Sequence, residues 1–151
     1  MIAWVYLDKK SAAVDALKDY SAMEFIIQGH DDAEKELRDS MTSVRPSAPT
    51  GMPHNTNPKS GEARLTAQID EIDVLKERYR SAVEYMAWFK PAWDELSEDD
   101  RFVLSEFYLH GNKSQEDSVG NICDRFQIER SSAYNKKNRV LARLSLLLYG
   151  R

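Results

Sequence analysis

The 151-residue chain contains a single cysteine, which excludes a disulfide framework and any zinc site built on several cysteines. Its three histidines lie far apart in the sequence and make no helical His pair that would bind a metal. The six glycines do not form a phosphate-binding loop. Because no carboxylate pair, nucleophile–base set or metal cluster is visible, we expect a protein that is not an enzyme and has no cofactor.

Long apolar runs are also missing. No stretch of 18 or more residues is apolar, so the sequence predicts no transmembrane helix. The first residues, MIAWVYLDKK, have no basic region before a six-residue apolar stretch, which is too short for the core of a signal peptide. With 42% apolar and 30% charged residues, the composition suits a modest core and a water-exposed surface. We therefore expect a cytoplasmic protein that does not contact membranes.

The net charge of −4 conceals a division along the chain. Residues 1–110 carry 13 basic and 21 acidic groups, whereas residues 130–151 carry six basic groups and no acidic one. An acidic body with a basic end predicts one face that binds a polyanion. The alternative is that the acid-free C-terminal helix merely complements its own dipole.

Two long segments, about 8–41 and 62–90, have the periodicity of helices. The apolar positions of each recur at alternating steps of four and three, with His30 and Glu34 as polar interruptions of the first series. His30 is interpreted as a partly buried residue rather than a metal ligand. Pro91 indicates a break or kink after the second segment. Trp88, Phe89 and Trp93, close to Pro91, are expected to be packing residues.

Between these segments, residues 42–60 hold four of the five prolines and have no periodicity, which predicts a flexible loop containing a solvated His54. Two long helices joined by such a loop favour an antiparallel, coiled-coil-like hairpin over residues 1–92, with its loop at about 42–61. In this pairing Tyr20, Ile27 and Leu37 face, in some order, the residues Tyr79, Ile72 and Leu65. Because each apolar stripe is narrow, we expect further burial either against a second protomer, in a homodimer or higher homo-oligomer, or against the C-terminal domain.

The remaining residues, 93–151, predict a small domain of three helices. Ser97 is a good N-cap for the first of these, and Gly111 is expected to close it as a left-handed C-cap. The second runs from near Ser114 to Phe126, and a tight turn follows at 127–129. The last begins near Arg130 and ends at about residue 149. This arrangement is typical of a helix-turn-helix domain in an all-α protein.

The stretches LSEDDRFVLSEFYLHG and ICDRFQIERSSAYNKKNRVLARL resemble the last helix-turn-helix region of sigma factors. They are more similar still to phage and prophage transcriptional regulators of the RinA and ArpU type. Those proteins resemble this chain over nearly its whole length, including a loop with Thr42-Ser43 and Gly51-Met52-Pro53. Their closing pattern of an aromatic, a basic residue and a leucine is matched by Tyr134, Arg139 and Leu141.

This resemblance implies control of late-gene or packaging-related transcription in a phage. Two features differ from the family pattern. Residues Asn112–Ser118 lengthen the link before the second helix of the domain by about five residues. Gln127 occupies a turn position that is commonly glycine or a similarly small residue, which requires the backbone either to avoid positive φ or to tolerate its cost.

A helix of this kind reads double-stranded DNA from the major groove with the residues near its N-terminal end. The candidate base-reading residues share the outward face of the last helix: Ser131, Ser132, Asn135 and Lys136. The candidate phosphate-binding residues are basic neighbours, which set affinity rather than sequence preference: Arg130, Lys137 and Arg139. The expected inward residues are apolar: Ala133, Val140, Leu141 and Leu144. Tyr134 either packs against Phe126, which we favour, or places its hydroxyl on a phosphate. Cys123 is expected to be a small buried residue.

The leading hypothesis is therefore a phage-type, sequence-specific DNA-binding transcriptional regulator. Its hairpin would serve self-association or contact RNA polymerase. Two alternatives remain open. One is a phage packaging component similar to a terminase small subunit, and the other is a sigma-like module that docks on RNA polymerase.

Overall fold

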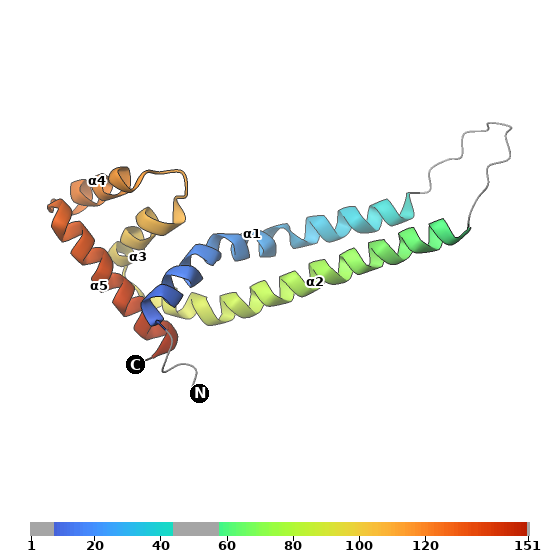
Figure 1. The fold of residues 1–151 in the computed structure, drawn as a ribbon, viewed down its shortest axis with the longest axis horizontal. Coiled ribbons are helices and arrows are strands. Elements are labelled where there is room, and N and C mark those ends of the chain that lie inside the picture. Colours follow the sequence, from blue (N-terminus) through green and yellow to red (C-terminus); the bar gives the residue numbers. More distant parts are fainter. Residues whose placement is uncertain (1–7, 44–57, 151) are drawn as a thin grey trace. The chain divides into compact units, whose positions relative to one another are not determined.

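The computed structural model describes residues 8–43 and 58–150, with side chains from residue 61 in the second range. The described residues contain helices and no strand, which confirms the expected all-α class (Figure 1). The elements are α1 (Lys9–Thr42), α2 (Pro58–Glu95), α3 (Glu98–Leu104), a π-helical segment η2 (Ser105–Leu109), α4 (Gln115–Phe126) and α5 (Arg130–Tyr149). Most of the expected loop, including His54, lies outside the described residues.

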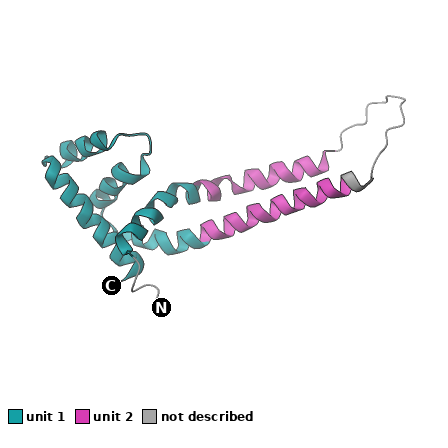
Figure 2. Cartoon of the chain, in the orientation of Figure 1, with its two compact units in different colours: residues 1–24, 84–151 teal, residues 25–83 magenta. Residues whose placement is uncertain are grey.

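The chain divides into two compact units (Figure 2). Unit 1 comprises residues 1–24 and 84–151, so it contains the start of α1, the end of α2 and all of α3 to α5. Unit 2 comprises residues 25–83. The division falls inside α1 and α2, and each unit therefore takes part of both long helices.

Of the break or kink expected at Pro91, the break does not occur, because α2 continues through this proline to Glu95. Proline lacks the amide that would donate to the carbonyl of the residue four positions earlier, here Ala87. Both Pro91 and Ala87 are exposed, so water can satisfy the freed carbonyl. The helix ends one turn later, and few further hydrogen bonds depend on its geometry.

The main core of unit 1 brings α1, α2 and α5 together. Phe89 is fully buried, and its ring lies beside those of Tyr20, Tyr85 and Trp93, at centroid distances of 5.4, 5.3 and 5.9 Å. This contradicts the expected pairing of Tyr20, which packs against Phe89 and Trp93 instead. The cluster also takes in further buried side chains: Ala13, Ala16, Leu17, Leu96, Leu104, Val140, Leu141, Leu144 and Leu148. Each large apolar side chain buried here stabilises the fold by about 1.5–3 kcal/mol.

A second, smaller cluster joins α3, α4 and α5 through Val103, Val119, Ile122 and Ala133. Cys123 packs against this cluster as a small apolar residue, but it is partly exposed rather than buried as expected. Trp88 packs as expected, with its ring 5.6 Å from that of Tyr149, and it stays 38% exposed.

Ser97 caps α3 by accepting a hydrogen bond from the Asp100 amide, as its position predicted. The helix does not end at Gly111 with a left-handed residue. It widens into the π-helical segment η2, which ends at Leu109, and Gly111 has no positive φ. The Ser118 hydroxyl donates to the Glu106 carbonyl at 2.6 Å, so a side chain of α4 satisfies a backbone acceptor of the widened turn.

The Glu106 carboxylate ties the link to α4 and is itself buried. It accepts hydrogen bonds from Lys113 Nζ at 3.1 and 3.2 Å and from Asn121 Nδ2 at 3.1 Å. Burial raises the pKa of this group, but Asn121 and Lys113 outweigh burial and hold the pKa below its usual value. A buried carboxylate with these partners fixes α4 against η2.

The residues Asn112–Ser118 do not form a lengthened link. Ser114 caps α4, with its side chain accepting from the Asp117 amide, and Gln115–Ser118 is the first turn of the helix. Ser118 is buried in that turn. The link before α4 therefore consists only of residues 110–114.

In unit 2 the end of α1 and the start of α2 run antiparallel. The His30 ring stacks on Tyr79 at 4.2 Å, and Gln68 Nε2 donates to Ser40 Oγ at 3.4 Å. His30 is 9% exposed and lies 3.4 Å from a Glu34 oxygen, which agrees with the prediction that it is partly buried. Only two apolar side chains of the unit are buried among the described residues, Ile72 and Ala82.

Candidate nucleic-acid interface

The connection between α4 and α5 is three residues long and contains the strained Gln127. This residue adopts the left-handed conformation, with φ 53° and ψ 49°, and its amide donates to the Cys123 carbonyl. For a residue with a Cβ, this conformation costs about 1–2 kcal/mol. The Gln127 side chain offsets part of the cost, because its Nε2 donates to the Asp124 carbonyl at 2.6 Å. The backbone therefore tolerates positive φ here without glycine.

The buried face of α5 fixes which of its side chains point to solvent. Ala133 is fully buried in the smaller cluster, and Val140, Leu141 and Leu144 are buried in the main core. These are the four residues predicted to face inward. Because they anchor one stripe of the helix at both ends, the opposite stripe is held outward.

The outward stripe carries short polar side chains near the start of α5. Ser131, Ser132 and Asn135, all predicted to read bases, are exposed. Asn138 is exposed too and was missed by the sequence reasoning. It follows Asn135 by three residues and Ser131 by seven, and this helical spacing is the signal that would have found it.

Lys136 and Lys137 lie at the margins of this stripe and are only half-exposed. The Lys136 ammonium is 4.5 Å from the centroid of the Phe126 ring, and that of Lys137 is 4.9 Å from the centroid of Phe107. Cation–π contacts at such sites are worth about 0.5–1 kcal/mol. Either lysine can therefore swing away to an anion at small cost.

Arg130 and Arg139, predicted to contact phosphates, are both exposed on α5. Neither has an ion-pair partner among the described residues, so their charges are available. Arg143, one turn beyond Arg139, differs because its Nη1 lies 3.6 Å from an Asp100 oxygen.

Tyr134 does not pack against Phe126 as expected. It is 37% exposed, and its ring lies 5.9 Å from that of Phe107. The expectation failed because Phe107, in η2, comes from a turn whose π-helical geometry the sequence did not indicate. Tyr134 therefore adds a hydroxyl and an aromatic edge to the outward side of α5.

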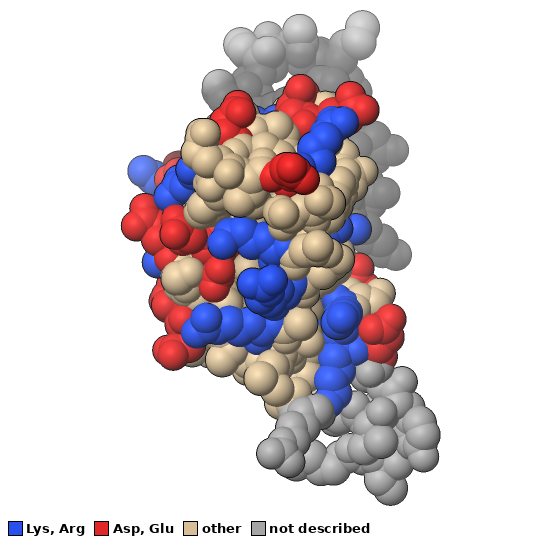
Figure 3. Space-filling view, turned by 90° about the vertical axis from the view of Figure 1, so that its left-hand side faces the viewer, with Lys and Arg blue, Asp and Glu red and all other residues tan. Residues whose placement is uncertain are grey.

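Seen from the side on which α4 and α5 lie in Figure 1, Lys and Arg side chains form a band with acidic groups at its borders (Figure 3). Arg125 of α4 stacks over the Phe102 ring at 4.2 Å and lies 3.3 Å from an Asp99 oxygen. Glu116 and Asp117 occupy the first turn of α4, and Glu129 precedes α5. The basic side chains of α5 differ from Arg125 because their own helix carries no acidic residue.

Other kinds of site find no support in the described part of the chain. No group of three or more His, Cys, Asp or Glu there is arranged to hold a metal ion. None of the helices in residues 8–43 and 58–150 combines the length and apolar character needed to cross a membrane. The chain matches no protein-family model, no curated protein and no solved structure.

Proposed function

We propose that this protein binds double-stranded DNA through α5 and acts as a transcriptional regulator. The observation that carries the proposal is the exposed stripe at the start of α5, which has polar side chains at its centre and cations beside it. It stands on a helix without any acidic residue, in a chain of net charge −4. Charge placed so unevenly favours a polyanionic partner on this face.

The connection and packing of α4 and α5 suit a sigma-like helix-turn-helix. In such domains the second helix enters the major groove and its N-terminal residues reach the base edges. Here the three-residue connection and the smaller apolar cluster hold α4 against α5. The buried stripe of α5 leaves Ser131, Asn135 and Asn138 free to approach a groove.

The residues divide by chemistry into two roles. Asn135 can donate and accept, so it can bind adenine with two hydrogen bonds, while Ser131 and Ser132 offer single hydroxyls. Lys136 reaches guanine acceptors after leaving the Phe126 ring. Arg130, Lys137 and Arg139 contact phosphates and set affinity without reading sequence.

The resemblance to regulators of the RinA and ArpU type extends the proposal to control of late or packaging-related genes in a phage. On this proposal residues 1–92 form a helical hairpin that presents the C-terminal domain, and a dimer reads two half-sites. RNA polymerase is a further partner in this scheme. We infer that the protein acts in the cytoplasm of the bacterial host.

Selection of bound duplexes from a random library with the purified full chain tests the proposal. We expect one enriched sequence, bound more tightly at 50 mM than at 200 mM salt, because phosphate contacts release counterions. Lys18→Ala, which removes an exposed cation from α1, should bind the enriched duplex like the parent.

Three results would contradict this function. Equal binding of every duplex in the library would show that α5 binds DNA through charge alone and does not read its sequence. Absence of DNA binding at low salt, together with binding to RNA polymerase, would favour the sigma-like docking module. Ring assembly on one packaging site without an effect on transcription would favour the packaging component.

A further inference from the structure

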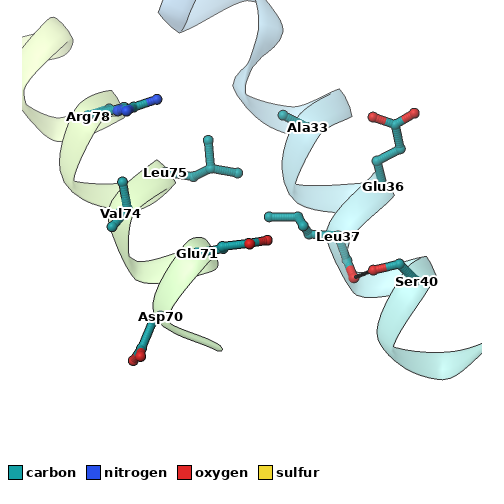
Figure 4. Close-up of a pocket in the computed structure, with 9 residues that line it drawn as sticks. All are labelled: Ala33, Glu36, Leu37, Ser40, Asp70, Glu71, Val74, Leu75 and Arg78. Carbon is teal, nitrogen blue, oxygen red and sulfur yellow. Dashed lines mark hydrogen bonds between the residues drawn. The ribbon is translucent and has the colours of Figure 1, made fainter. Parts of the chain in front are cut away.

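Unit 2 carries an open groove between α1 and α2 that its own side chains do not fill. The groove measures about 670 Å³ (Figure 4). Leu37 and Leu75 point toward one another across it, with Ala33 beside them and Val74 on α2. Val74 is 50% exposed.

A second groove of about 240 Å³ adjoins the first, because Ala33, Leu75 and Arg78 line both. It adds Phe25, which is 76% exposed, and Gly29. The two together form one trough along one face of unit 2. Its apolar floor has no hydrophobic cluster beneath it, since both clusters of the described residues lie in unit 1.

Four charged side chains line the first groove, the carboxylates Glu36, Asp70 and Glu71 and the cation Arg78. Glu71 and Arg78 both extend from α2 toward the groove, and neither forms an ion pair among the described residues. They are seven residues apart, or about 10 Å along the helix, which is too far for a direct pair. Val74 and Leu75 lie midway between them in sequence.

Gly29 is a further unexplained feature of the trough. Glycine inside a helix costs about 1 kcal/mol relative to alanine. A Cβ built on Gly29 meets nothing within 4 Å, so packing within the chain does not require glycine here. A glycine at this position allows another backbone to approach closely.

We propose that the trough is occupied by the same trough of a second copy of this chain, around a two-fold axis near Val74 and Leu75. An isologous contact places residue i on residue j and j on i. With the two α2 helices antiparallel, Arg78 of each copy meets Glu71 of the other, and Val74 lies at the centre. One operation then pairs Arg78 with Glu71 and covers the open apolar floor.

The size of the face indicates a moderate affinity. Residues 25–42 of α1 span about 27 Å, and the face formed by α1 and α2, each about 10 Å in diameter, is about 20 Å wide. The area of this face is therefore about 540 Å² on each copy. The total of about 1,100 Å² is just above the roughly 1,000 Å² expected of a specific interface. We therefore expect a reversible dimer rather than an obligate one. The inference does not rest on DNA binding.

Sedimentation equilibrium of the full chain, from about 1 to about 100 µM, tests the interface. Val74→Asp should weaken self-association at least tenfold, because it puts a charge at the centre of the contact. Arg78→Glu and Glu71→Arg should each weaken it by setting like charges opposite each other. The double variant Glu71→Arg with Arg78→Glu should recover most of the loss, since the pair re-forms between copies.

Two control variants test which face of α2 forms the contact. Asp73→Arg makes the same change of charge as Glu71→Arg but two residues away, about 200° around the helix, and should associate like the parent. Ile69→Asp, at a 45% exposed residue outside the trough, should do the same. Circular dichroism verifies that each variant keeps its helices.

Four results would overturn the proposal. They are a parent that remains monomeric up to about 100 µM, a folded Val74→Asp variant that associates normally, and a double swap as weak as either single change. The fourth is disruption by Ile69→Asp alone, which would move the interface to the other face. Binding of the monomer to a duplex with one half-site does not need this interface, so that measurement separates a failure of this proposal from a failure of the proposed function.

Discussion

The two units of the chain use the same two helices in different ways. In unit 1, α1 and α2 pack with α3, α4 and α5 around two apolar clusters that contain every fully buried large side chain of the described residues. In unit 2, the continuations of α1 and α2 bury only Ile72 and Ala82 as apolar residues. Large apolar side chains there stay exposed, among them Phe25 and Val74.

This difference indicates that unit 1 is stabilised by its own core, whereas unit 2 has helix propensity and, on our proposal, a second copy of the chain to stabilise it. Helices in water are marginal unless an apolar face is buried. Polar pairs supply some of the missing support in unit 2. Arg38 donates to Glu34, and this hydrogen bond lowers the pKa of the carboxyl despite opposition from burial.

Truncation of Phe89 should have the largest effect. Phe89→Ala removes a fully buried ring surrounded by aromatic neighbours, and we expect the free energy of unfolding to fall by about 3–5 kcal/mol. The matched change in unit 2, Ile72→Ala, should cost about 2 kcal/mol or less, because no cluster surrounds it. Urea unfolding followed by circular dichroism measures both. Equal decreases in the free energy of unfolding for the two variants would contradict the difference between the units.

Removal of the Glu106 charge should have an intermediate effect and show whether unit 1 also depends on a buried polar network. Glu106→Gln leaves Lys113 without its carboxylate, and the expected loss is about 1–3 kcal/mol at neutral pH. The folded-state pKa of Glu106 is lowered, so its contribution is present above the unfolded value near 4.5 and disappears as pH falls through the folded value.

Parent and variant should therefore converge in stability as the pH is lowered below about 4.5. The measurement is urea unfolding of both proteins at several pH values. A constant difference between them at all pH values would show that the charge of Glu106 does not stabilise the link to α4.

The smallest expected effect is a gain at the turn before α5. Gln127→Gly removes the left-handed strain but adds freedom to the unfolded chain, and we expect a net stabilisation of about 0.5–1 kcal/mol. Gln127→Ala keeps the strain and loses the hydrogen bond to the Asp124 carbonyl, so it should be less stable than the parent. Thermal melts rank the three proteins. A glycine variant less stable than the parent would show that the side-chain bond outweighs the strain.

Local signals in the sequence predicted much of unit 1. Ser97 caps α3 as predicted, the next helix begins near Ser114 as predicted, and the inward residues of α5 follow its apolar period. These features depend on neighbours within one or two turns. The same reasoning applied to Gly111 failed, because the π-helical segment moves the end of the helix.

Features that depend on distant contacts were not predictable in the same way. Two apolar stripes of similar period can pair in several registers, so Tyr20 was assigned partners other than Phe89 and Trp93. The positions of Lys136 and Lys137 depend on Phe126 and Phe107, which come from other elements. Asn138, by contrast, could have been found from its spacing alone.

The central claim is that the outward stripe of α5 reads DNA sequence, and Asn135→Ala tests it most directly. Fluorescence anisotropy compares the binding of the parent and the variant to the selected duplex and to a random one. Compared with the parent, Asn135→Ala should show about 1–3 kcal/mol less preference for one base of the selected duplex. Its affinity for the random duplex should equal that of the parent. Lys137→Ala is the matched contrast, because it should weaken both duplexes alike and reduce the salt slope by about one. Equal weakening of both duplexes by Asn135→Ala, or no change in either, would contradict the claim.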